Sequence, residues 1–76
     1  MTDHDETLDA LGLLCPLPVL KARKRISALS SGQILRMIAD DPAAIVDVPH
    51  YCHEAGHRLL AQTDNDGILT FDIQKK

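Results

Sequence analysis

The residue best suited to chemistry in this chain is a cysteine flanked by prolines, in the segment Cys15, Pro16, Leu17 and Pro18. A residue before proline avoids the α region, as does the N-cap residue of a helix, so we expect Cys15 at an N-cap and Pro16 at the first helical position. The positive end of a helix favours a thiolate, and the prolines hold the sulfur in one direction. The segment predicts a nucleophile that attacks another sulfur or carries a persulfide; the alternative is a small apolar residue that closes a strand.

Basic residues follow the cysteine closely. Residues 11–39 contain five basic residues and no acid, whereas residues 1–10 contain four acids and no base. Four of the five are Lys21, Arg23, Lys24 and Arg25, which form either a solvated helix face or a landing site for an acidic partner protein. A net charge of −3 and an aromatic content of 3% argue against direct binding of nucleic acid.

The histidines give a second pattern that could bind a ligand. The segment from His53 to His57 matches H-E-x-x-H, in which two histidines on one helix bind zinc, and His50 lies on roughly the same face. Gly56 and the β-rich residues 58–64 indicate that the helix ends before His57. We therefore expect exposed histidines at a helix end, with no metal and no cofactor; a metal-binding module is the alternative.

The elements that must position Cys15 follow from the spacing of apolar residues. We predict strands over residues 7–13, 33–39, 58–64 and 68–74, with a tight turn at 65–67. One helix is expected over residues 16–31, and a second from the turn at 40–42 to Gly56, kinked or restarted at Pro49. Cys52 shares a helical face with Ile45 and Val48, so we expect it in the core. The order β-α-β-α-β-β predicts an α+β, two-layer sandwich with a four-stranded mixed sheet and both helices on one face.

The chain of 76 residues predicts one small domain. We expect residues 1–6 to be a flexible acidic tail and residues 7–76 to form the domain. There is no apolar run of about 18 residues and no signal-peptide pattern, so we expect no membrane contact. Two cysteines 37 positions apart do not make a disulfide scaffold, so we expect reduced thiols and a cytoplasmic location.

Taken together, these motifs resemble the TusA/SirA-like family of sulfur carriers, most closely its TusA branch. The segment from Cys15 to Pro18 matches the family's C-P-x-P motif, and residues 8–13 and 38–43 look like the TusA segments around it. Asp47–Val48–Pro49, Cys52 and Gly67 extend the resemblance over nearly the whole chain from Thr7 onward. Leu14 and Leu17 depart from it, because many members have charged or polar residues there.

The resemblance implies a sulfurtransferase in which Cys15 is catalytic and Gly12, Pro16 and Pro18 form the supporting motif. Cys15 would accept sulfur from a cysteine desulfurase as a persulfide and pass it to TusD of the TusBCD complex. The product is 2-thiouridine at the tRNA wobble position, so tRNA would be only an indirect partner. Other members supply molybdenum-cofactor assembly or sulfur oxidation, and a non-catalytic regulatory module is the alternative from another class.

Overall fold

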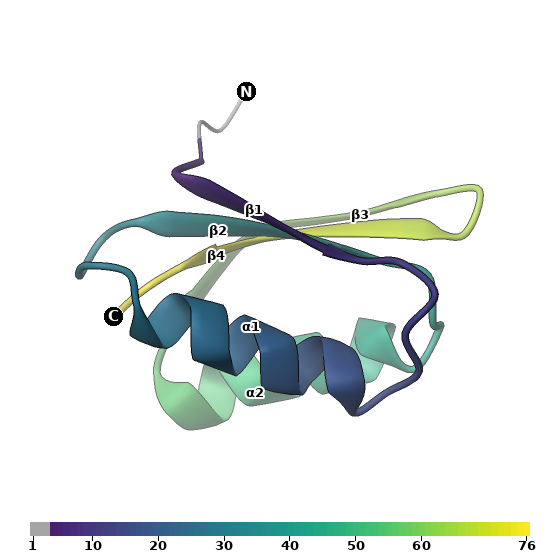
Figure 1. The fold of residues 1–76 in the computed structure, drawn as a ribbon, viewed down its shortest axis with the longest axis horizontal. Coiled ribbons are helices and arrows are strands. Elements are labelled where there is room, and N and C mark those ends of the chain that lie inside the picture. The colour runs from purple at the N-terminus through teal and green to yellow at the C-terminus, as the bar shows by residue number, and fades with distance from the viewer. Residues whose placement is uncertain (1–3) are drawn as a thin grey trace.

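The structure is a computed structural model and describes residues 4–76. Its elements are β1 (Glu6–Ala10), α1 (Leu17–Ser27), β2 (Ile34–Ala39), α2 (Ala44–Ala55), β3 (Arg58–Asn65) and β4 (Ile68–Gln74). Both helices lie on the same face of the sheet, so the predicted two-layer α+β sandwich is confirmed (Figure 1). Neither helix in these residues has the length and apolar character needed to span a bilayer.

The sheet is mixed, as predicted, with the strand order β1-β2-β4-β3. β1 and β2 are parallel, and Ala10 at the end of β1 pairs with Ala39 at the end of β2. The pairs β2–β4 and β3–β4 are antiparallel. Because parallel strands end at the same edge of a sheet, the loops that follow β1 and β2 lie at the same end of the molecule (Figure 1).

The core lies between the helices and the sheet and consists mainly of aliphatic side chains, with Phe71 and Tyr51 as its two aromatic residues. Its largest fully buried side chains are Phe71, Ile26, Leu35, Met37, Leu69, Ile73, Val48 and Pro18. Cys52 is also buried, at 2% exposure, which confirms its predicted packing role. Ile45 does not share that role, because it is 41% exposed.

The first strand and the first helix are both shorter than the apolar pattern predicts. β1 ends at Ala10 because Leu11 and Gly12 form a turn, in which Gly12 takes a φ of +78°. α1 ends at Ser27, and the ammonium of Lys75 donates hydrogen bonds to the carbonyls of Ser27 and Leu29 there, at 3.4 and 2.6 Å. These bonds satisfy carbonyls that the helix end leaves free.

The second helix continues through its proline. We expected a kink or a restart at Pro49, but α2 is one helix from Ala44 to Ala55 with Pro49 inside it. Proline cannot donate to the carbonyl of Ile45, a loss of one helical bond. The buried Val48 and Cys52 on either side of it anchor the helix to the core.

The first strand begins one residue nearer the N-terminus than we expected. Glu6, which we placed in a flexible tail, is the first residue of β1. The N–H of Asp5 donates to the carbonyl of Ile34 at 2.8 Å, and the carboxylate of Asp5 accepts the N–H of Ile34 at 2.7 Å. Residues 1–3 of the predicted tail lie outside the described residues.

Candidate functional site

Cys15 lies in the loop between β1 and α1, one residue before the helix cap. We expected it to be the N-cap, but that position is occupied by Pro16, and the helix starts at Leu17. The reason is local: the N–H of Leu17 bonds to the carbonyl of Leu14 at 2.9 Å, which makes a turn around Cys15. The first helical bond then runs from the N–H of Leu20 to the carbonyl of Pro16, at 3.1 Å. The thiol is partly buried and reduced, and the Cys15–Pro16 peptide bond is cis.

Two aspartates from the loop after β2 hold the cysteine loop in place. The carboxylate of Asp40 accepts the N–H of Gly12 with both oxygens, at 3.0 and 3.2 Å. The carboxylate of Asp41 accepts the N–H of Cys15 at 2.8 Å and that of Ala43 at 3.0 Å. These two backbone donors lower the pKa of Asp41, so its carboxylate stays charged.

Sequence reasoning missed this positioning role, because it treated residues 40–42 only as a turn and a helix start. The signal that could have found it is the parallel pairing of the first two predicted strands. That pairing brings Ala10 and Ala39 together, so an acidic pair just after the second strand must lie beside the loop after the first.

The environment of Cys15 opposes a thiolate, and the expected stabilisation by the helix terminus is wrong. The pKa of the thiol is raised from 9.0 to about 11, first by burial and then by the nearby carboxylate of Asp47. The negative charge of Asp41 acts in the same direction. Cys15 also lies outside the helix, and the two prolines after it supply no N–H groups to an anion. Burial and nearby negative charge together therefore outweigh the helix terminus.

The basic residues of α1 do not form a single face. Lys21, Lys24 and Arg25 line a shallow depression of about 280 Å³ on the side of the helix next to β1. Arg25 is held there by an ion pair with Glu6, at 2.6 Å. Arg23 lies on the other side, with its guanidinium 5.5 Å from the centre of the Tyr51 ring. Only part of the predicted basic cluster is therefore available for one docking surface.

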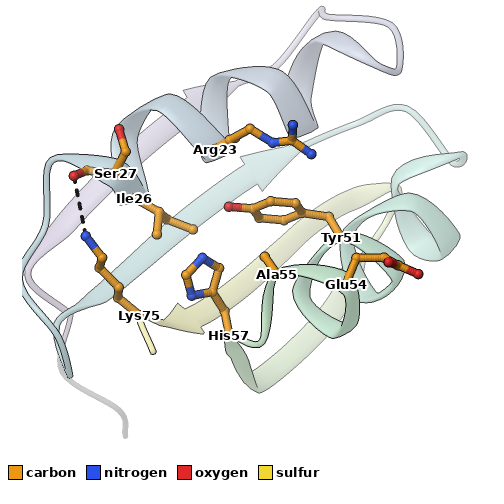
Figure 2. Close-up of a pocket in the computed structure, with 8 residues that line it drawn as sticks. All are labelled: Arg23, Ile26, Ser27, Tyr51, Glu54, Ala55, His57 and Lys75. Carbon is orange, nitrogen blue, oxygen red and sulfur yellow. Dashed lines mark hydrogen bonds between the residues drawn. The ribbon is translucent and has the colours of Figure 1, made fainter.

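A groove runs between the two helices, away from the cysteine. Near Pro16 it is a hollow of about 640 Å³ lined by Val19, Asp47 and His50, among others. A second hollow of about 460 Å³ follows it and shares Arg23, Tyr51 and Glu54 with the first. Figure 2 shows this second hollow, whose eight lining residues are Arg23, Ile26, Ser27, Tyr51, Glu54, Ala55, His57 and Lys75. The two hollows together form a groove that runs from the end of the molecule near Pro16 to the end near Lys75.

The histidine motif does not form a zinc site. As predicted, α2 ends before His57, because Gly56 takes a left-handed conformation with a φ of +79°. His57 is held by the C-terminal backbone, since its Nδ1 accepts the N–H of Lys76 at 3.1 Å. Burial and the charges of Lys75 and Lys76 lower its pKa. Within residues 4–76, no group of three histidine, cysteine or acidic side chains could hold a metal ion.

Comparison with known proteins identifies the family of the chain. The family described as Sulfurtransferase TusA matches residues 6–75. The Sulfur carrier protein TusA of Allochromatium vinosum is 43% identical over 75 residues, which cover 99% of this chain and 99% of that protein. The corresponding protein of Pseudomonas entomophila is 45% identical over 78 residues and covers 100% of this chain and 98% of its own. A crystal structure of a SirA-like protein from Desulfitobacterium hafniense superposes with a TM-score of 0.83 at 25% identity, over 92% of this chain and 96% of that one. The chain therefore belongs to the TusA family of sulfurtransferases and sulfur carriers.

Proposed function

We propose that this protein relays sulfur through a persulfide on Cys15, taking it from a cysteine desulfurase and giving it to a TusD-type acceptor. The observation that carries the proposal is the contrast between the two cysteines: Cys15 is partly accessible in a loop fixed by Asp41, whereas Cys52 is 2% exposed. Because the family consists of sulfurtransferases and sulfur carriers, a fixed and accessible thiol is suited to carry the transferred sulfur.

The relay needs no oxidant, because each step exchanges one sulfur–sulfur bond for another. The thiolate of Cys15 attacks the outer sulfur of the donor persulfide, the donor's S–S bond breaks, and the donor leaves as a thiolate that takes up a proton. The acceptor thiolate then attacks the outer sulfur on Cys15 and restores the original thiol. In each step the attacking thiol must first lose its proton, so the raised pKa of Cys15 slows attack by the free protein.

For the destination of the sulfur, we propose 2-thiolation of the tRNA wobble uridine in the cytoplasm. The support is the resemblance of residues 8–13 and 38–43 to TusA segments, together with 43–45% identity to curated TusA proteins. The protein has neither a basic excess nor stacking aromatic side chains, so it would act on tRNA only through the acceptor.

The test begins with sulfur loading. Purified protein is incubated with a cysteine desulfurase and cysteine, and the mass of the intact protein is measured under non-reducing conditions. We expect one added sulfur, about 32 Da, on wild type and on Cys52→Ser, and none on Cys15→Ser. An adduct of equal yield on Cys15→Ser would show that the site is elsewhere.

The pathway is tested separately in cells. Deletion of the gene should reduce 2-thiouridine in tRNA, and expression of wild type should restore it while Cys15→Ser should not. Normal 2-thiouridine in the deletion strain would refute the tRNA destination but leave the carrier chemistry intact.

A further inference from the structure

Three large apolar side chains are exposed in the loop that carries Cys15 and the first turn of the helix that follows it. Leu14, Leu17 and Leu20 are 72%, 48% and 50% exposed. The N–H of Leu17 bonds to the carbonyl of Leu14 in the turn around Cys15, and Leu17 and Leu20 are three residues apart on one side of α1. We call these three residues the leucine stripe. Single exposed leucines are ordinary, but an apolar path that starts at a reactive group indicates an interaction surface.

Two carboxylates border the same thiol. Asp41 is fixed by the backbone of Cys15 and Ala43, and Asp47 on α2 lines the hollow next to Pro16 and raises the pKa of the thiol. None of the ion pairs recorded within residues 4–76 includes either carboxylate. Two features therefore surround the thiol. The apolar stripe lies on the loop that carries Cys15 and on α1, and the negative charge comes from Asp47 on α2 and Asp41 in the loop before α2.

We propose that the leucine stripe docks the protein with which Cys15 exchanges sulfur, and that this partner places apolar side chains on the stripe and a cationic side chain beside Asp41 and Asp47. The proposal rests on the proposed function, because sulfur exchange brings the partner's sulfur into contact with that of Cys15. A protein in that position must cover Leu14, the residue just before Cys15. A cation brought next to the two carboxylates also offsets the negative charge that opposes the thiolate.

The charges argue against two other occupants. A second copy of this chain docked symmetrically at Cys15 would bring both pairs of carboxylates together at the symmetry axis. An anionic lipid surface would face the same repulsion, in addition to the net charge of −3. An apolar protein surface with a local positive charge satisfies both features of the site.

A peptide series tests the chemistry of the surface without assuming which protein binds. Four short peptides carry a cysteine as a mixed disulfide with thionitrobenzoate, flanked by either leucine or serine and by either lysine or glutamate. Release of thionitrobenzoate at pH 7.5 gives the rate of attack by Cys15. We expect wild type to react about tenfold faster with the leucine–lysine peptide than with the serine–glutamate peptide.

Variants then assign the two preferences. Leu14→Ser with Leu17→Ser should bring the leucine and serine peptides to within about twofold of each other, and Asp47→Asn should do so for the lysine and glutamate peptides. Leu60→Ser is the matched control, because Leu60 is 37% exposed but lies on β3, and it should keep both preferences. Equal rates of wild type with all four peptides, or an unchanged leucine preference in the double variant, would overturn the proposal.

The remaining outcomes separate the surface from the pathway. A dimer of wild type in sedimentation that Leu14→Ser disrupts, or flotation of wild type with phosphatidylglycerol vesicles that Leu14→Ser abolishes, would assign the stripe to another occupant and overturn the proposal. Failure of a desulfurase to load wild type, with the peptide preferences intact, would reject that donor and support the docking surface.

Discussion

Replacing Asp47 by asparagine should make Cys15 a faster nucleophile in the free protein. The pKa of the thiol is about 11 instead of 9.0, and the carboxylate of Asp47 is the largest cause after burial. At pH 8 a thiol with a pKa of 11 is about 0.1% thiolate, against about 9% for a pKa of 9, a difference of about 90-fold. Asp47 accounts for only part of that shift, so we expect Asp47→Asn to lower the pKa by about one unit and to raise the rate at pH 8 about tenfold.

The assay is alkylation by iodoacetamide between pH 7 and pH 11.5, followed by mass spectrometry of the peptide that contains Cys15. Peptide analysis keeps the signal of Cys15 apart from that of Cys52, whose pKa burial also raises to about 11. Asp66→Asn is the matched control, since Asp66 lies in the β3–β4 turn with a φ of 52° that asparagine tolerates. A midpoint near 9 in wild type, or one that does not fall in Asp47→Asn, would refute the electrostatic reasoning.

Three further predictions concern stability and docking. Arg36→Ala should lower the free energy of unfolding by about 3–5 kcal/mol in urea denaturation, because it removes the partner, at 2.8 and 3.0 Å, of an Asp72 that is 4% exposed; a loss below about 1 kcal/mol would contradict this. Stability should decline as the pH rises from about 9 toward 11, because both cysteines have folded-state pKa values above their unfolded ones and the native state holds those protons longer; a flat profile of thermal midpoints over this range would be inconsistent. Lys21→Glu with Lys24→Glu should slow sulfur transfer from a desulfurase several-fold at low salt and much less at 0.5 M salt if an acidic partner lands there, and an equal effect at both salt concentrations would exclude steering.

The sequence predicted the parts of this fold that depend on local pattern. The order of strands and helices, the face that carries both helices and the burial of Cys52 all follow from the spacing of apolar residues. Features that depend on contacts between distant segments were not predicted. The cap of α1 by Lys75 spans 48 residues from Ser27, and the Arg36–Asp72 pair crosses from β2 to β4. The spacing of apolar residues along the chain contains no information about either contact.

The shift in the pKa of Cys15 is the clearest case in which residues distant in the sequence reverse a prediction made from neighbouring residues. When only the cysteine and its prolines are considered, the nearest source of an electrostatic field is the helix N-terminus, and its positive end favours a thiolate. The fold adds Asp41 and Asp47, which are 26 and 32 positions further along the chain but beside the sulfur. Only the parallel pairing of β1 with β2 brings the Asp41 loop there, so no reading of residues 12–18 could have found it.

A raised thiol pKa is compatible with efficient relay if deprotonation is coupled to docking. Away from a partner, the free thiol is almost entirely protonated at neutral pH, so it attacks disulfides and oxidants slowly. A partner cation beside Asp41 and Asp47 cancels charge at the place where the thiolate forms, so the nucleophile is strengthened only while a partner sulfur is within reach. The same two carboxylates thus would limit unwanted reactions in the free carrier and favour partners of complementary charge. This coupling predicts that Asp47→Asn gains alkylation rate but loses discrimination between lysine and glutamate peptides, two changes that a merely structural defect would not produce together.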